Sequence, residues 1–321
     1  MRAARQRAYG TPAVVVDDAE IPTPKPDEVL VRVRASGLNA ADWFTSTGKP
    51  YIARLASGLL RPSPSVQGKD LAGIVEAVGA AVTGFAIGDE VYAENAAGAF
   101  AEFACVPARF LAVKPSTLSF ERAAVVPLSG NTALQGLREL AQVQPGQRVL
   151  VNGASGGVGT FAVQIAAALG AEVTGVCSTA NLELVRSLGA AAVVDYTTTD
   201  FTVTGERYDV IFDLVGNHSL RDCRRALTER GVLVLSSGSG HPVFGPMGRI
   251  LRALVMTLFI SQSLRPHAAT RSAARLDDLR AMIENGQIAP VLERTVTLTD
   301  LPEALEAVGS GRTRGKVAVR I

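Results

Sequence analysis

Hydrophobic and polar positions follow two different patterns along the chain. In the second half, short β-branched runs that suit strands buried on both faces alternate with segments whose apolar residues recur at helical spacing. Residues 148–152 (RVLVN) are the first such run, and residues 160–170 (TFAVQIAAALG) are the first helical segment, which ends at a glycine. Further strands are expected at 171–177, 191–196, 208–216 and 231–238, with helices at 181–189 and about 219–227. This order predicts an α/β fold with a mostly parallel, doubly wound sheet covered by helices on both faces.

One apolar run in this half fits two structures. Residues 255–261 (VMTLFIS) are expected to form a sixth strand, and the end of a buried helix is the alternative.

The first half of the chain has the pattern of an all-β domain. Residues 24–43 contain a turn and a long alternating strand in which Val31 and Val33 face one side. Residues 67–93 form several short strands separated by glycine turns, and a helix is expected to begin near Ser119. A mostly-β domain therefore precedes the α/β domain, and we expect it to form one wall of a cleft.

Composition narrows the class of protein. The 321 residues are 47% hydrophobic and carry a net charge of +2 with scattered charges, so a large buried core is expected, with no nucleic-acid or membrane partner. The three cysteines are far apart, which suits a reducing cytoplasm better than a disulfide framework. The N-terminal residues lack the apolar core of a signal peptide, and the apolar run 250–260 is too short to span a bilayer. We therefore expect a soluble cytoplasmic protein.

The junction between the first strand and helix of the α/β domain carries a nucleotide-binding fingerprint. Ala154 stands at its first small position, Gly156 lets the backbone approach a pyrophosphate, and Gly159 lets the helix pack close to the strand. Backbone N–H groups of Gly157 and Val158 at the start of the helix are expected to meet the phosphates. Strand, loop and helix stand in the required order, so a dinucleotide site is predicted.

The end of the second strand indicates which dinucleotide fits. A carboxylate commonly reads the ribose 2′-OH about 20 residues after the glycines, whereas this chain has Ser178, Thr179 and Asn181 there. Hydroxyl and amide groups can donate to a 2′-phosphate, so we expect NADPH rather than NADH. Ala180 occupies a position where an arginine would favour a phosphate. The same run also fits a simple cap for the next helix, and both roles are compatible.

An ordered set of motifs, GKDLAGIVEAVG, GDEV, GAFAEF, NGASGGVG and GVCSTANLELVRSLGA, resembles the medium-chain dehydrogenase/reductase superfamily, in particular its zinc-independent quinone oxidoreductase branch. The resemblance runs from about Tyr9 to the end of the chain. It implies a GroES-like mostly-β catalytic domain at 1–122, a Rossmann NADP-binding domain at 123–267 and a C-terminal return at 268–321 that completes the catalytic domain.

Zinc ligands of the related alcohol dehydrogenases are missing from this sequence. Asn39 stands where those enzymes have a cysteine, Gly68-Lys69-Asp70 replaces their Gly-His-Glu motif, and Cys105 is alone between residues 93 and 115. Amide and ammonium groups do not replace thiolate or imidazole ligands, so no metal is expected. Without a Lewis acid to hold an alkoxide, the favoured reaction is hydride delivery from NADPH to a quinone or to the β-carbon of an α,β-unsaturated carbonyl.

Catalytic candidates follow from the resemblance. Asn39 and Asp42 are implied at the cleft floor beside the nicotinamide, and Asn39 could donate an N–H to a carbonyl oxygen. For Asp42, capping of the short helix at 40–44 is the alternative role. Lys69 is a candidate whose alternative is a surface ion pair with Asp70, and Tyr51 either lines the pocket or packs.

Further cofactor contacts are expected around the two domains. Thr132 is implied near the carboxamide or a phosphate, Tyr196 near adenine, and Lys316 near the cofactor or else as a strand cap. Open α/β sheets bind ligands at the carboxyl ends of their strands, which adds Val215, Gly216, Ser236 and Ser237.

Other functions stay open beside the reductase. The fold does not by itself give the function, so the chain could be an NADPH-binding regulatory or structural protein with little turnover, or a biosynthetic tailoring enzyme acting on a bulky substrate. The apolar segment 248–267 could line that substrate, or form core and the face of a homodimer. The physiological substrate does not follow from the sequence.

Overall fold

The structure is a computed structural model, which describes residues 1–11, 14–236, 243 and 245–321. The chain folds into two compact units. The first unit contains residues 1–131, 271–286 and 290–321, and the second contains residues 132–270 and 287–289. The domain boundaries predicted from the sequence, after residues 122 and 267, fall slightly earlier in the chain than these divisions.

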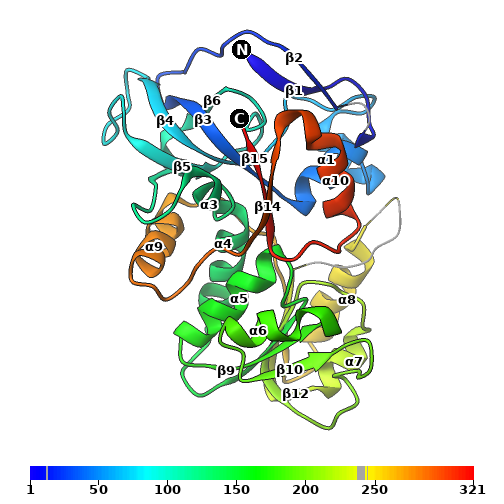
Figure 1. The fold of residues 1–321 in the computed structure, drawn as a ribbon. Coiled ribbons are helices and arrows are strands. Elements are labelled where there is room, and N and C mark those ends of the chain that lie inside the picture. The colour runs from blue at the N-terminus through cyan, green and yellow to red at the C-terminus, as the bar shows by residue number, and fades with distance from the viewer. Residues whose placement is uncertain (12–13, 237–242, 244) are drawn as a thin grey trace. The chain divides into compact units, whose positions relative to one another are not determined.

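The first unit is built on a seven-stranded sheet with the order β14-β15-β3-β4-β5-β7, in which β6 also pairs with β3. Its strands are β3 (Glu28–Leu38), β4 (Asp70–Val78), β5 (Glu90–Glu94), β6 (Phe103–Pro107), β7 (Leu111–Val113), β14 (Leu292–Thr297) and β15 (Lys316–Arg320). The C-terminal strand β15 lies beside β3, antiparallel to it (Figure 1). The C-terminal segment therefore completes a sheet that the first half of the chain begins.

Alternation within β3 follows the predicted pattern. Val31 and Val33 are buried while the residues that follow each of them, Arg32 and Arg34, are exposed, because successive side chains of a strand point to opposite faces. The two valines belong to a core that includes Leu71, Val91 and Val106 from neighbouring strands. A separate antiparallel hairpin pairs β1 (Arg2–Gln6) with β2 (Val14–Asp18).

Helices of the first unit are short. They are α1 (Ala40–Thr47), α2 (Arg54–Ser57), α3 (Phe120–Ala124), α9 (Ala273–Glu284) and α10 (Leu301–Gly309), with 3₁₀ turns η2 (Tyr51–Ala53), η3 (Ala108–Phe110) and η6 (Leu298–Asp300). Helix α4 (Pro127–Leu134) contains the division between the units. As expected from the sequence, Ser119 begins α3, and its hydroxyl oxygen accepts the backbone N–H of Arg122.

The second unit contains a six-stranded sheet with the order β10-β9-β8-β11-β12-β13. The strands are β8 (Arg148–Asn152), β9 (Glu172–Cys177), β10 (Ala192–Asp195), β11 (Tyr208–Asp213), β12 (Leu227–Leu235) and β13 (Ser263–Pro266), and all neighbouring pairs are parallel. The helices are α5 (Gly157–Ala168), α6 (Leu182–Ser187), α7 (Leu220–Arg225) and α8 (Met247–Thr257), with a π-helical turn η4 (Gln135–Leu140) and a 3₁₀ turn η5 (Thr179–Asn181). The predicted doubly wound α/β architecture is confirmed (Figure 1).

Two local predictions in this unit were wrong. Residues 255–257 end helix α8 instead of forming a strand, and β13 further along the chain is the sixth strand. The alternative of a helix end is correct for residues 255–257, but this end is only partly buried, because Val255 and Leu258 are 49% and 78% exposed while Met256 packs against the core. Leu227 begins β12 and does not end the preceding helix. The hydrophobicity of a segment does not show whether another part of the chain will bury its apolar side chains.

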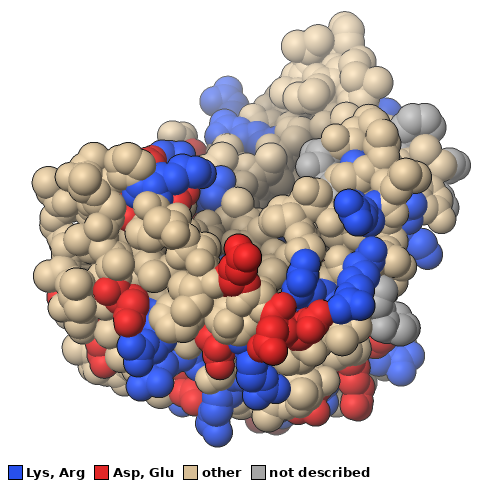
Figure 2. All heavy atoms as spheres, turned by 90° about the horizontal axis from the view of Figure 1, so that it is seen from above, with Lys and Arg blue, Asp and Glu red and all other residues tan. Residues whose placement is uncertain are grey.

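No helix in the described ranges is long and apolar enough to cross a membrane. All three cysteines are free. In the view of Figure 2, acidic and basic side chains lie next to one another instead of gathering by sign. That face therefore carries no extended basic stripe of the kind that binds a nucleic-acid backbone.

Candidate active site and dinucleotide site

The loop between β8 and α5 has the geometry that its glycines predict. A Cβ added to Gly159 would lie 2.0 Å from the carbonyl oxygen of Gly153, so only glycine fits this approach of helix to loop. Gly153 itself has a φ of 89°, a conformation that glycine adopts without strain. At Gly156, by contrast, an added Cβ would meet only that same oxygen at 3.5 Å. Contacts within the protein therefore do not require glycine at 156. This agrees with the prediction that the position is small so that a pyrophosphate can approach the backbone.

Ala154, the first small residue of the fingerprint, is fully buried. Its Cβ would lie 3.1 Å from a Cβ added to Gly175 of the neighbouring strand β9. The alanine side chain therefore points into the protein and leaves the outer side of the loop to its backbone. Gly157 and Val158 form the first turn of α5, as expected.

Asn181 joins the glycine loop to the end of β9. Its side-chain N–H groups donate to the hydroxyl oxygens of Ser155 and Ser178, each at 3.2 Å. The three side chains are half-buried. Ser155 was not among the residues predicted from the sequence, because nothing in the local pattern shows that the two loops meet.

A carboxylate does stand close to the predicted 2′-phosphate contacts. Parallel pairing sets Asp195 at the end of β10 beside Cys177 at the end of β9. The Thr179 hydroxyl donates to Asp195, and Thr197 donates to it from both its backbone N–H and its hydroxyl. These hydrogen bonds hold the pKa of Asp195 below its ordinary value, so the group is charged at neutral pH. Sequence reasoning found no carboxylate here because it considered only the end of the second strand.

Tyr196 follows Asp195 and is 60% exposed, with its backbone N–H bonded to the carbonyl oxygen of Cys177. The side chain is thus available at the same sheet edge as Ser178 and Thr179. Its contact with adenine stays a prediction.

Asp213 organises the carboxyl ends of β8 and β11. One of its oxygens accepts the side-chain amide of Asn152 at 2.9 Å and the backbone N–H of Gly216 at 2.9 Å, and also receives the N–H of Val215 at 3.3 Å. The other oxygen pairs with the Arg249 guanidinium at 2.6 Å. The predicted cofactor residues Val215 and Gly216 are therefore held by a buried carboxylate that the sequence analysis did not identify.

Ser236 also belongs to this sheet edge, and its backbone N–H donates to the carbonyl oxygen of Asp213 at 3.0 Å. Ser237 lies outside the described residues.

Asn39 lies at the centre of a buried polar cluster in the first unit. Its side-chain N–H groups donate to an Asp70 oxygen at 3.0 Å and to the carbonyl oxygen of Gly37 at 3.3 Å, and its own oxygen accepts from the Lys316 ammonium. Lys316 also donates to the carbonyl oxygen of Leu38 at 3.0 Å and lies 3.8 Å from Asp70. The ammonium thus has partners inside the first unit, and its predicted contact with the cofactor is not among them.

Burial shifts the pKa values of the ionisable groups in this cluster. Desolvation raises the pKa of Asp70 and lowers that of Lys316, and each charge opposes the shift of the other. Glu94 is also buried, which raises its pKa, and it accepts the side-chain amide of Asn131 at 3.2 Å. Asp70 further accepts the backbone N–H of Leu128 at 3.0 Å. Several carboxyl groups therefore share a small, poorly solvated volume with one buried cation.

Asp42 lies in the first turn of α1, where it is 1% exposed and accepts the backbone N–H of Asn39 at 2.9 Å. It therefore stabilises the start of α1, with Asn39 at the N-cap position. Burial raises the pKa of Asp42 to about 6, although the positive charge of Lys69 acts to lower it.

Three further predicted side chains are Lys69, Tyr51 and Thr132. Lys69 donates to the carbonyl oxygen of Ala96 at 3.4 Å, so the suggested ion pair with Asp70 is replaced by the pair of Asp70 with Lys316. Tyr51 is 45% exposed under the Arg54 guanidinium, 4.8 Å from the ring centroid. Thr132 is buried in α4.

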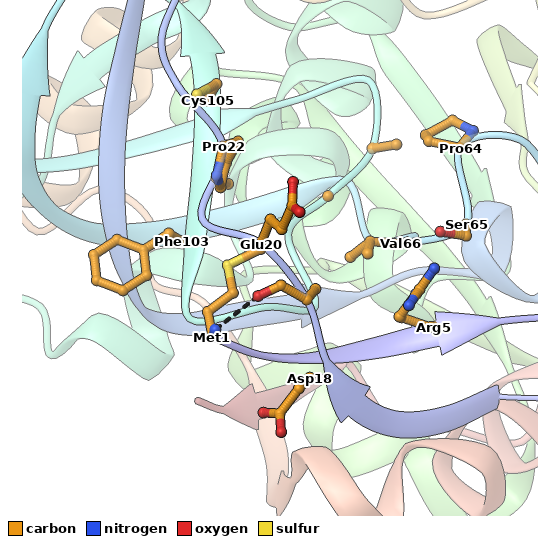
Figure 3. Close-up of a pocket in the computed structure, with 14 residues that line it drawn as sticks. Met1, Arg5, Asp18, Glu20, Pro22, Pro64, Ser65, Val66, Phe103 and Cys105 are labelled. Carbon is orange, nitrogen blue, oxygen red and sulfur yellow. Dashed lines mark hydrogen bonds between the residues drawn. The ribbon is translucent and has the colours of Figure 1, made fainter.

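A pocket of about 820 Å³ opens elsewhere in the first unit (Figure 3). Met1, Arg5, Phe103 and Cys105 are among the residues that line it, and the Met1 amine donates to the Ala19 carbonyl oxygen at 2.7 Å. None of the predicted site residues lines this pocket.

Comparison with known proteins decides the family. An alcohol dehydrogenase GroES-like domain model matches residues 25–116, and a zinc-binding dehydrogenase model matches residues 188–319. A quinone oxidoreductase of Pseudomonas aeruginosa is 33% identical, over 97% of this chain and 97% of its own length. The chain belongs to the quinone oxidoreductase branch of the medium-chain dehydrogenase/reductase superfamily.

Other members of this superfamily are similar over most of their length. The 2-methylene-furan-3-one reductase of Solanum lycopersicum is 30% identical over 99% of this chain and 79% of its own length. An NADPH-dependent alkenal/one oxidoreductase of Arabidopsis thaliana is 31% identical over 93% of this chain and 73% of its own length.

Solved structures of medium-chain reductases have the same fold. The quinone oxidoreductase of Coxiella burnetii superposes with a TM-score of 0.88 at 26% identity and covers 100% of this chain and 99% of its own. The Escherichia coli quinone oxidoreductase, solved in complex with NADPH, superposes with a TM-score of 0.82 at 26% identity over 100% of this chain and 99% of its own.

One of the two matched models is named for zinc-binding dehydrogenases. Among the residues described here, no cluster of three or more histidine, cysteine or acidic side chains could hold a metal ion. Asn39 and Lys69 instead engage in hydrogen bonds with their neighbours. The absence of zinc stays a prediction to be measured.

Proposed function

We propose that this chain is an NADPH-dependent oxidoreductase that reduces quinones or the carbon–carbon double bond of α,β-unsaturated carbonyl compounds. The observation that carries the proposal is full-length similarity to proteins named quinone oxidoreductase and alkenal/one oxidoreductase. The glycine loop of the second unit supports it, because the loop keeps the close helix approach at Gly159 and an open side at Gly156. NADPH is the cofactor of the alkenal/one relative and the ligand in the E. coli structure.

Residues of the second unit fit such a cofactor. The start of α5 would hold the pyrophosphate, and Val215, Gly216 and Ser236 would line the crevice at the strand ends. When bound, NADPH supplies the hydride that the protein's own side chains cannot provide. Thr132, Tyr196 and Lys316 remain proposed contacts.

Residues of the first unit would orient the substrate. A substrate carbonyl oxygen could receive an Asn39 N–H in exchange for the bond to Gly37, which at 3.3 Å is the longer of the two amide bonds. Donation to an oxygen that gains negative charge stabilises the product-like state more than the ground state. Tyr51 and Lys69 are proposed to act at the same site.

The proton that completes the reduction is proposed to come from solvent. Asp42 is held inside the unit by its bond to Asn39, and its pKa of about 6 leaves it mainly ionised at neutral pH. Because the backbone N–H of Asn39 already engages this carboxyl, the contacts favour a positioning role for Asp42 over proton donation. We therefore propose that Asp42 and Asn39 fix the start of α1, while water protonates the substrate.

Turnover measurements test this function. Purified protein should consume NADPH with members of a panel of quinones and enones, and Asn39→Ala should lower kcat/KM by about 10- to 100-fold, the value of one hydrogen bond to developing charge. Exposed Ser187 on α6 offers a matched control, and Ser187→Ala should leave kcat/KM unchanged. NADPH binding without turnover on any panel member would favour the regulatory role instead.

We further propose a cytoplasmic homodimer formed through α8. Met247, Leu251, Leu254, Val255 and Leu258 recur at helical spacing and are each between 49% and 78% exposed. The helix packs beside β13, which is an edge strand of the parallel sheet. An apolar stripe next to a strand that ends the sheet among the described residues suits a second copy of the same surface. Three free cysteines agree with a reducing compartment.

The oligomeric state tests that surface. Light scattering after size exclusion should give twice the mass of the 33.5 kDa chain, and Leu254→Glu with Leu258→Glu should give the single mass with the fold retained. A wild-type monomer at micromolar concentration would rule the dimer out.

A further inference from the structure

Two cavities of the first unit adjoin beside strand β1. The larger, of about 820 Å³, is the pocket of Figure 3, and the smaller has a volume of about 490 Å³. Arg5 and Ser65 line both cavities. Backbone contacts fix this shared wall, because the N–H of Gln6 donates to the Ser65 carbonyl oxygen at 2.7 Å and Arg5 forms a β-bridge with Val66. All lining residues of both cavities belong to the first unit.

The smaller cavity is rich in positive charge. Its lining includes three arginines and two serines, namely Arg5, Arg7, Arg61, Ser63 and Ser65, and among the described residues no acidic side chain lines it. Arg7 is paired with Asp17, whereas the side chains of Arg5 and Arg61 have no hydrogen-bond or ion-pair partner within the described ranges. Two guanidinium groups are therefore available to an anion, which would also relieve the repulsion between them.

Nearby charges limit how much negative charge this site accepts. The hydrogen bond from Arg7 lowers the pKa of Asp17, and the positive charge of Arg5 adds a smaller effect in the same direction. Asp17 is therefore ionised at neutral pH and lies close enough to Arg5 to feel its charge. A ligand with one negative charge is repelled less by this carboxylate than a ligand with two.

The larger cavity offers an apolar surface next to these arginines. Its apolar lining includes Pro22, Val66, Phe103 and Ala104. In Figure 3, Arg5 lies on the same side of the pocket as Val66, and Phe103 lies on the opposite side. Two exposed carboxylates also line this cavity, Asp18 and Glu20, and Asp18 pairs with Arg2 at the other end of β1 from Arg5. They repel an anionic group, so the charged end of a ligand is directed to the arginines and its apolar part to the rest of the pocket.

From this arrangement we propose that the first unit binds an aliphatic monocarboxylate, with its carboxylate at Arg5 and Arg61 and its hydrocarbon chain in the larger cavity. Guanidinium groups bind a carboxylate through paired N–H donors, and the hydroxyls of Ser63 and Ser65 can add further donors. None of the residues predicted for cofactor binding or catalysis lines either cavity. The inference therefore does not rest on the proposed reductase function.

Calorimetric titration of the full-length protein with decanoate tests this site. Decanoate should bind at one site per chain, and Arg5→Gln and Arg61→Gln should each weaken it by about 5- to 20-fold through the loss of a charged hydrogen bond. Arg34→Gln is the matched control, because Arg34 is an exposed arginine of β3 that lines neither cavity, and it should leave the dissociation constant unchanged. The unfolding temperatures of the variants should match that of the wild type, since neither Arg5 nor Arg61 has a side-chain partner to lose within the described ranges.

The hydrocarbon chain gives an independent signature. Octanoate should bind about 3- to 10-fold more weakly than decanoate, because two fewer methylene groups leave water. Phe103 lies on the side of the pocket away from Arg5, so Phe103→Ala should reduce the advantage of decanoate over octanoate.

The charged group is tested by changing it at constant chain length. Decyl phosphate should bind more weakly than decanoate because of its additional negative charge, and decyltrimethylammonium should not bind at this site. Added salt should weaken decanoate in the wild type more than in Arg5→Gln.

Four outcomes would contradict the proposal. Decanoate binding that is unchanged in both arginine variants would place the ligand elsewhere and overturn the site. Equal affinities for acetate and decanoate would overturn its apolar part. Tighter binding of decyl phosphate, lost in the arginine variants, would overturn the choice of a carboxylate in favour of a phosphate ester. No binding of decanoate at millimolar concentration would overturn the whole inference.

Discussion

Asn39, Asp42, Asp70 and Lys316 show how strongly the properties of a residue depend on its surroundings. Each would be an ordinary polar side chain in solvent, yet each is less than 5% exposed here. Hydrogen bonds satisfy the Asn39 amide completely, and desolvation changes the pKa values of its ionisable neighbours. Two predictions follow at this scale.

The first concerns Asp42 and pH. Its pKa is raised from 3.8 in the unfolded chain to about 6 in the folded protein, so the folded state binds more protons between these values. The free energy of unfolding should therefore fall as pH rises from about 4 to about 6, by up to about 3 kcal/mol from this group. Asp42→Asn removes the titration, while its side-chain oxygen can still accept the Asn39 N–H.

Urea unfolding of both proteins at a series of pH values measures this effect. Asp70 and Glu94 also have raised pKa values, so the quantity of interest is the difference between wild type and variant. The wild type should lose more stability than Asp42→Asn over this range. Parallel curves would mean that Asp42 titrates as in water.

The second prediction concerns the buried pair. Lys316→Met leaves Asp70 without its counter-charge and should lower the free energy of unfolding by about 3–5 kcal/mol. Adding Asp70→Asn should recover part of that loss, since both members of the former pair are then neutral side chains. Chemical denaturation at pH 7 compares the three proteins, and a double variant no more stable than Lys316→Met alone would show that the charges do not interact.

At the scale of elements, the glycine loop separates packing from ligand binding. Gly159→Ala places a Cβ 2.0 Å from a backbone oxygen, so α5 or the loop must shift, and stability should fall together with the affinity for both dinucleotides. Gly156→Ala meets only one atom at 3.5 Å and its φ of −80° suits alanine, so stability should be nearly unchanged while cofactor affinity falls by about tenfold or more. Thermal unfolding and cofactor titration of the two variants check this contrast. Unaltered binding in Gly156→Ala would place the pyrophosphate elsewhere.

Helix α8 illustrates a different lesson about elements. The sequence supports both strand and helix there, and its apolar side chains suggested burial. In the structure they form an exposed stripe instead. An isolated chain leaves such a stripe in water at a cost, which is why we assign it to a second copy.

At the scale of the whole molecule, the proposed chemistry requires no zinc. Purified protein should contain far less than one zinc per chain and should retain its activity in a chelator, because amide, ammonium and carboxylate groups occupy the positions of the missing ligands. Elemental analysis and assays with and without chelator test this. About one zinc per chain, lost together with activity, would contradict the assignment of the site.

The sequence by itself determined most of the order of strands and helices, the doubly wound sheet and the glycine loop, although not the sixth strand. These features depend on local properties, namely apolar spacing, β-branching and the conformational freedom of glycine, all of which can be read within some 20 residues. The motif set added the family and the positions of Asn39 and Asp42.

Only the tertiary structure decided which polar groups meet. Asn39 contacts Lys316 across 277 positions, Asp213 contacts Arg249 across 36, and Thr179 contacts Asp195 across 16. Such contacts depend on strand order and register, which bring distant segments to one edge of a sheet or into one core. Burial then decides which carboxyl groups titrate abnormally, because desolvation depends on all the surrounding chain and not on the neighbours in sequence.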